Sequence, residues 1–344
     1  MSEIRHSISS GISRVLPAKL LKSALGYSSD QDYVRNMFGV NFSYGNREIL
    51  LKYVGLDYSH QIVGILEHGA PGFQTDYDFR TPRFLNGTLT KHWTWSQQTE
   101  MIAKSRGFTN VIAIGAPWYY LKRSLVKESV SNNSGPDRFL IMPSHSTGNA
   151  VDTATISAKK AKAKMFRDIT GDAPATVCLH AVDFCDLETF RAFREVGFEV
   201  TCIGNSFQQP LWSNAGSRVR MMFNLYELML NHTHYVSDGY GTSLHYAIDL
   251  GLEVGLFPEI KKLQILANSE SKSREYFQEL NEQEVKYLKE QVPTLVNKFS
   301  AGGEYLAFSR AMLGFNSVKE PDELSDILDY RPNIYPLNLG TEPW

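Results

Sequence analysis

A glycine-rich turn flanked by hydroxyl residues has the residue types needed to hold a phosphate. Residues 237–243 read Ser-Asp-Gly-Tyr-Gly-Thr-Ser; an apolar run precedes them and a helical pattern of apolar residues follows them. Glycines permit close backbone approach, and hydroxyls and amides at the start of a helix favour an anion. The alternative is a plain strand-turn-helix junction, in which such residues are common caps. The predicted phosphate contacts are Gly239, Gly241, Thr242 and Ser243, and Asp238 is a further candidate binding residue of the same turn.

Other polar loops follow apolar runs in the same half of the chain. The runs at 138–142, 176–181 and 199–203 each end in small or polar residues. Ligands in open α/β sheets bind beyond the carboxyl ends of the strands, so these loops should border the same site. The spacing of His180 and Asp183 also suits a metal, but no third ligand accompanies them and no metal is predicted. The further donor-binding candidates are Ser144, His145, Ser146, His180, Asp183, Gly204 and Asn205.

The first half of the chain offers a candidate base. Glu67, His68 and Gly69 end the apolar run at 60–66, and Gly69 would let the backbone turn so that the imidazole faces a cleft. An imidazole suits proton removal from a hydroxyl group because its ordinary pKa is about 6.5. Asp76, in the loop that follows, is a reserve carboxylate, so the predicted catalytic group is His68, Glu67 and Asp76. The alternative for His68 is a histidine hydrogen-bonded within its own turn.

The elements that would position these residues alternate between short apolar runs and helical segments. This alternation of strands and helices predicts an α/β fold with two Rossmann-like domains facing each other across a cleft. The polar stretch 129–137 is the expected linker between domains at 1–130 and 131–320. The residues from 321 to 344 form the expected carboxyl-terminal tail. Several prolines from residue 331 onward predict that its end is irregular and packs on the surface.

Composition excludes several classes of function. A formal net charge of −2 gives no basic footprint for nucleic acid, so no nucleic-acid partner is predicted. Three cysteines, an odd number without zinc-like spacing, read as reduced residues of a cytoplasmic protein. The sequence has no apolar run long enough to span a bilayer. Residues 4–25 interleave apolar and basic residues and could rest on an anionic membrane surface, or could form an ordinary helix capping the first domain.

Residues 235–257 resemble the carboxyl-domain donor motif of GT-B glycosyltransferases. In that motif a strand ends at a small-acidic-glycine turn, and a helix then leads through a Leu-Gly turn into the next strand. Many retaining members carry two glutamates flanking the helix, and the matching positions here are Gly241 and Asp249. The resemblance therefore implies a donor grip made of hydroxyls and amides. His145 resembles the histidine that sialyl- and Kdo-transferases use on a CMP-sugar, and Thr242 with Ser243 resembles their paired hydroxyls.

The Glu67-His68-Gly69 turn resembles the His-Gly turn that supplies the base in polymer-forming GT-B transferases of bacterial surface polysaccharides. Together these resemblances imply a glycosyltransferase of capsule or O-antigen synthesis. It would have no tightly bound cofactor, a CMP-, UDP-, GDP- or dTDP-linked sugar as donor, and a glycan or lipid-linked glycan as acceptor. Two alternatives stay open: a nucleotide-sugar 2-epimerase of the same fold, and a non-catalytic glycan-binding protein. The aromatic segments at 93–95 and 118–120 fit either sugar stacking or core packing.

Overall fold

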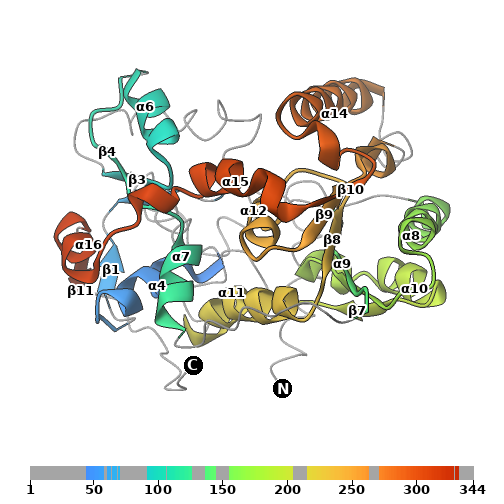
Figure 1. Cartoon of the computed structure of the whole chain (residues 1–344), viewed down its shortest axis with the longest axis horizontal. Helices are drawn as coiled ribbons and strands as arrows, with labels where there is room; N and C mark the ends of the chain where they lie inside the picture. The colour runs from blue at the N-terminus through green and yellow to red at the C-terminus, as the bar shows by residue number, and fades with distance from the viewer. Residues whose placement is uncertain are drawn as a thin grey trace, which may run out of the picture.

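The structure is a computed structural model, and two α/β units dominate it (Figure 1). It describes residues 44–57, 60–62, 64–67, 69, 91–105, 107–125, 136–144, 155–203, 215–262, 271–328 and 330–332. Residues 4–25 and the stretch 126–135, which holds most of the expected linker, lie outside these ranges. The sequence-based expectation of two Rossmann-like units is confirmed by the parallel sheets described next, whereas the domain boundaries stay a prediction.

The larger unit is built on a six-stranded sheet. Its order is β10-β9-β8-β5-β6-β7; the first five strands along the chain are parallel, and β10 runs antiparallel to β9. Counted along the chain, this is the order 3-2-1-4-5-6, in which the winding direction reverses between β5 and β8. The strands are β5 (Phe139–Ile141), β6 (Ala175–Cys178), β7 (Glu199–Thr201), β8 (His234–Ser237), β9 (Glu253–Leu256) and β10 (Phe299–Ala301).

Helices connect these strands and cover the sheet (Figure 1). Two of them begin at side-chain caps: the Thr155 hydroxyl accepts from the Ala158 amide at 3.3 Å, and the Asp186 carboxylate accepts from the Glu188 amide at 3.2 Å. The long charged run expected as a helix does end before Pro293, but the run continues into β10, which was not expected. The helices are α8 (Ile156–Thr170), α9 (Ala181–Phe184), α10 (Leu187–Glu195), α11 (Ala215–Leu230), α12 (Thr242–Asp249) and α14 (Ser271–Gln291).

The smaller unit has a parallel three-stranded sheet in the order β2-β3-β4. The expected helix start at Ser96 is confirmed, since its hydroxyl accepts from the Thr99 amide at 3.1 Å. Pro117 opens the next helix at a position where its missing N–H costs nothing. The elements are β2 (Ile65–Leu66), β3 (His92–Thr94), β4 (Val111–Ala113), α4 (Asn46–Tyr53), α6 (Gln97–Ser105) and α7 (Pro117–Ser124).

The apolar run at 60–66, expected as one strand, forms two. β1 (His60–Ile62) pairs antiparallel with β11 (Tyr330–Pro332), whereas β2 joins the parallel sheet. Gly64 lies at the break, where a Cβ atom would be 2.2 Å from the Trp93 ring and 2.8 Å from the Lys91 carbonyl oxygen. Only a glycine lets the chain bend this close to the indole, and the bend turns the two halves of the run toward different partners.

The carboxyl-terminal part of the chain returns to the smaller unit. α15 (Leu306–Met312) contacts α12, and α16 (Pro321–Ile327) then leads to β11 beside β1 (Figure 1). The expectation of an irregular tail is therefore wrong for Arg331 and Pro332, which lie in β11. Pro332 can occupy this strand because the sheet has only two strands and each of them is an edge. The residues after 332 lie outside the described ranges.

One hydrophobic core joins the two units. It includes Ile49 and Trp118 of the smaller unit together with Leu140 and Tyr246 of the larger one. Trp118 stacks on Tyr246 with ring centroids 4.2 Å apart, and its indole N–H donates to Asp249 at 2.9 Å. Trp93, Trp95 and Trp118 are all buried. The core interpretation of the aromatic segments is thereby confirmed, and the sugar-stacking interpretation is wrong for these three rings.

Candidate functional site

Ser144 and Asp238 meet where the winding of the six-stranded sheet reverses. They follow β5 and β8, the two strands that flank the reversal, and ligands of doubly wound sheets bind at this point. The Asp238 carboxylate accepts from the Ser144 amide at 2.5 Å and from its hydroxyl at 3.0 Å. The structure thus brings together two residues that the sequence placed in the donor site. Asp238 is fully buried, so its carboxylate supports the site by holding Ser144 in position.

A lysine that sequence reasoning missed completes this contact. The Lys162 ammonium lies 2.9 Å from the Asp238 carboxylate and donates to the Ser144 carbonyl at 3.3 Å. Its helix α8 also directs Lys159 inward, where it pairs with Asp186. The spacing of residues in α8 could have revealed it, because one helical face carries Lys159, Lys162, Ala163 and Phe166. Lysines on an apolar face need buried partners, so this pattern indicates an internal ion pair.

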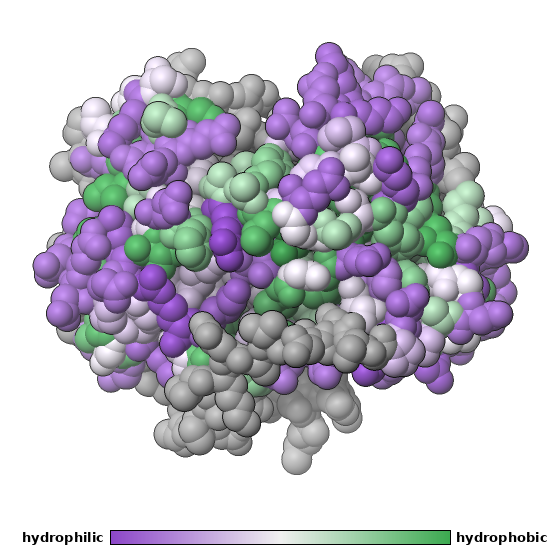
Figure 2. Space-filling model, viewed as in Figure 1, coloured by the Kyte–Doolittle hydropathy of each residue, from purple (hydrophilic) through white to green (hydrophobic). Residues whose placement is uncertain are grey.

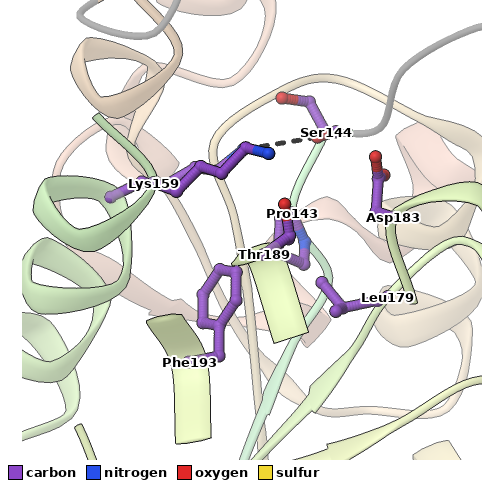
Figure 3. A pocket seen from close by; sticks show the side chains of 8 residues that line it. Pro143, Ser144, Lys159, Leu179, Asp183, Thr189 and Phe193 are labelled. Atoms are coloured by element: carbon purple, nitrogen blue, oxygen red, sulfur yellow. Dashed lines mark hydrogen bonds between the residues drawn. The ribbon is translucent and has the colours of Figure 1, made fainter. Parts of the chain in front are cut away.

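A small cavity lies beside these lysines (Figure 3). Its volume is about 20 Å³, room for about one water molecule and far less than a nucleotide needs. Asp183, a predicted donor contact from α9, lines it together with Ser144 (Figure 3). Lys162, which donates to the Ser144 carbonyl, also lines the cavity. His180 directly precedes α9 and is half-buried. This cavity can therefore accommodate a single polar group at the edge of a larger ligand.

The two glycines of the turn have different surroundings. A Cβ atom at Gly239 would lie 3.2 to 3.3 Å from atoms of Glu284, Lys261 and Ser144, so the backbone is closely packed there. Gly241 is extended, with φ −167°, and among the described residues a Cβ atom at Gly241 would meet only the Ser243 hydroxyl, at 3.9 Å. The described residues therefore leave space at Gly241, directly before the amino terminus of α12.

The two hydroxyls at the start of α12 make different contacts. Ser243 hydrogen-bonds the buried Tyr235 hydroxyl at 2.8 Å, and burial raises the pKa of Tyr235 to about 12. Thr242 faces the smaller unit: a Cβ atom at Gly69 would lie 2.8 Å from the Thr242 hydroxyl oxygen. The turn that follows β2 therefore approaches the beginning of the predicted donor helix.

The remaining predicted site residues are placed as follows. Glu67 is buried at the end of β2, and its carboxylate accepts a hydrogen bond from the Trp95 amide. That hydrogen bond holds Glu67 against the segment that follows β3. A catalytic role for Glu67 stays a prediction. Six other candidates lie outside the described residues: His68, Asp76, His145, Ser146, Gly204 and Asn205.

A buried histidine on α12 supports the site from behind. His245 is fully buried; its Nε2 atom lies 2.5 Å from the Tyr240 hydroxyl and its Nδ1 atom 3.0 Å from the Ser309 hydroxyl. Burial lowers the pKa of His245 to about 3, so the ring is neutral at ordinary pH. The network links the glycine turn to α15 and holds α12 in place.

His245 gives the first testable prediction, on pH. An unfolded chain binds a proton at this histidine below about pH 6.5, whereas the folded chain binds it only near pH 3, so the free energy of unfolding falls as pH drops through this window. In His245→Asn this loss should be smaller by about 1.4 kcal/mol for each pH unit below 6.5. Urea unfolding of both proteins at several pH values from 7 to 4.5 measures it. If the free energy of unfolding changes equally with pH in the two proteins, the low pKa assigned to His245 is contradicted.

The described residues hold neither a cluster of metal ligands nor a helix suited to a membrane. Within these residues, no three His, Cys, Asp or Glu side chains cluster as a metal ion would require. No helix there combines the length and apolar character needed to cross a bilayer. The surface in Figure 2 is notched between the lobe that carries α6 and the lobe that carries α14, with hydrophobic residues below the notch.

The chain was compared with known proteins. No protein-family model matches it, and no curated protein sequence matches it. Among solved structures, it is similar to S. aureus MnaA in its co-structure with UDP, at 12% identity and a TM-score of 0.34 over 79% of this chain; the match spans 65% of MnaA, less than two thirds. It is also similar to the UDP-GlcNAc 2-epimerase from Neisseria meningitidis bound to UDP-GlcNAc, at 12% identity and a TM-score of 0.33, covering 77% and 69% of the two chains.

Proposed function

We propose that this protein is a nucleotide-sugar-dependent enzyme and that the 237–243 turn holds the phosphate of the donor. The observation that carries the proposal is the meeting of Ser144, Lys162 and Asp238 at the point where the sheet's winding reverses. Beside it, the space that the described residues leave at Gly241 lies before the amino terminus of α12, a position that favours an anion. The donor would lie across this edge of the sheet, with one polar group at the cavity beside Lys159.

The first candidate reaction is glycosyl transfer to a hydroxyl of a bacterial surface glycan. The acceptor oxygen would bond to the anomeric carbon while the bond from that carbon to the donor phosphate breaks. His68 would take the hydroxyl proton, and the helix amides and lysines would offset the charge on the departing phosphate. The closeness of Gly69 to Thr242 supports this arrangement, because the residue after His68 lies against the beginning of α12.

The second candidate is nucleotide-sugar 2-epimerisation, the activity named for the N. meningitidis structure. Such a reaction needs several carboxylates around one closed pocket and no polymeric acceptor. Asp183, Asp238 and Glu284 lie around the turn and its neighbouring cavity, which favours this candidate over a non-catalytic glycan-binding protein. Breaking and remaking the C2–H bond would bring a solvent hydrogen to that carbon, whereas glycosyl transfer leaves it in place.

Product analysis in deuterated water separates the candidates. A transferase releases nucleotide only when a glycan acceptor is present and leaves the sugar's C2 hydrogen unexchanged. An epimerase changes the C2 configuration and incorporates deuterium without any acceptor. We expect His68→Ala to abolish turnover by a transferase while nucleotide binding remains. Nucleotide binding with neither product, across CMP-, UDP-, GDP- and dTDP-linked sugars and glycan acceptors, would support the non-catalytic alternative.

A further inference from the structure

A second lysine, Lys261, lies close to the glycine turn, where a Cβ atom at Gly239 would be 3.3 Å from its ammonium. Lys261 belongs to the short helix over residues 258–262 that follows β9, and its ammonium pairs with the Glu284 carboxylate of α14. Glu284 is nearly buried, with 5% of its side chain exposed, whereas Lys261 keeps 24% exposed. The pair therefore lies at the boundary of the solvent, with its acidic member inside.

The Glu284 carboxylate also contacts the backbone of the turn. Its Oε1 atom accepts from the Tyr240 amide at 2.7 Å while its other oxygen contacts Lys261. A Cβ atom at Gly239 would lie 3.2 Å from this Oε1 and 3.3 Å from the Lys261 ammonium. An oxyanion held between a glycine-turn amide and a lysine is the arrangement by which proteins bind phosphate.

We infer that Glu284 is an internal anion that holds Lys261 in the ligand-free protein and competes for it with the donor phosphate, and that Lys261 is the cation that the phosphate contacts when the ligand binds. This inference rests on the proposed function and adds two residues to its site. The carboxylate fills the amide and lysine contacts in the ligand-free protein, which offsets the burial of charge there. A phosphate that approaches from the open side at Gly241 would draw Lys261, the more exposed partner, away from Glu284.

Neutralising the internal anion tests this inference. Glu284→Gln keeps the shape and an oxygen that can accept from the Tyr240 amide, but it frees Lys261 for an added anion. We expect inorganic pyrophosphate, and any nucleotide that the protein binds, to bind roughly tenfold more tightly to this variant, because a charge-assisted contact no longer has an internal competitor. Isothermal titration of the full chain measures this affinity. An unchanged or weaker affinity would overturn the inference.

Lys261→Met is the complementary variant. It retains the apolar stem and leaves the Glu284 charge at the site, so pyrophosphate affinity should fall roughly tenfold. Adding Lys261→Met to Glu284→Gln should remove the gain of the single variant, as expected when two changes act on one site. If Glu284→Gln does not fold, Lys261→Met decides alone, and an affinity equal to that of the unaltered protein would overturn the inference.

A matched control and a nucleotide arm complete the design. Lys160 and Glu195 form an exposed pair at 2.8 Å on α8 and α10, so Lys160→Met and Glu195→Gln should leave pyrophosphate affinity unchanged. If the Glu284 and Lys261 variants change pyrophosphate affinity but no nucleotide binds, the anion site stands and the proposed function fails. If a nucleotide binds and neither variant alters its affinity, the proposed function stands and this inference fails.

Discussion

Asp238→Asn should destabilise the protein by about 3 to 5 kcal/mol, the usual result of removing one partner from a buried ion pair. Lys162 has only 6% of its side chain exposed and lies 2.9 Å from the Asp238 carboxylate. Without that negative charge, the buried ammonium would lose its carboxylate partner at 2.9 Å. The asparagine would also present N–H donors to a place where Ser144 and Lys162 already donate.

Urea unfolding followed by tryptophan fluorescence measures this loss. Asp168→Asn is the matched control, because its partner Lys164 lies at the same 2.9 Å but the pair is exposed, and exposed pairs contribute about 1 kcal/mol or less. Replacing Lys162 by Met in the Asp238→Asn background should restore part of the stability. A loss for Asp238→Asn no greater than that for Asp168→Asn would show that the charge at the sheet edge is not compensated in this way.

Asp249→Asn is expected to cost a similar amount and to loosen the contact between the two units. This carboxylate is 1% exposed and accepts from the Trp118 indole at 2.9 Å and from the Lys122 ammonium at 2.8 Å. Trp118 and Lys122 belong to α7 of the smaller unit, whereas Asp249 ends α12. The position that resembles a donor-gripping glutamate therefore joins the units instead of contacting a ribose.

The loss should reach about 3 kcal/mol, because the asparagine leaves the buried Trp118 and Tyr119 donors and the partly exposed Lys122 ammonium without a charged acceptor. Unfolding should also lose its single transition, so that fluorescence and circular dichroism report different midpoints. Glu320→Gln is the control, since its pair with Arg123 is exposed and close to the same helix. Coincident midpoints and a loss below 1 kcal/mol for Asp249→Asn would contradict the account of the interface.

The sequence was sufficient to locate the elements that carry the candidate site. β8 lies at the expected residues 234–237, and α12 buries Leu244, Ala247 and Ile248 as its apolar pattern predicted. Local patterns contain this information, because alternation and helical spacing follow from which face an element buries. The approach of Ser144 to Asp238 also followed from the rule that strand ends in an open sheet share one edge.

The sequence could not reveal the charged partners of the site. Ser144 and Asp238 are 94 positions apart, and Tyr240 and Glu284 are 44 apart, so each pairing depends on the finished fold. Glu284 sits in a helix crowded with surface charges, and nothing in its local pattern distinguishes it from them. The division of the run at 60–66 was hidden for the same reason, since it depends on the Trp93 ring lying against Gly64.

We propose above all that a nucleotide-sugar phosphate binds at the beginning of α12. Thermal unfolding with saturating CMP, UDP, GDP or dTDP tests it, because a ligand at 100 times its dissociation constant stabilises the native state by about 2.7 kcal/mol. Gly241→Val provides the site control: its extended backbone suits valine and a Cβ atom has room, but the side chain would fill the approach. We predict that at least one nucleotide stabilises the unaltered protein and that none stabilises a folded Gly241→Val. Stabilisation by none of the four nucleotides, or equal stabilisation of both proteins, would contradict the claim.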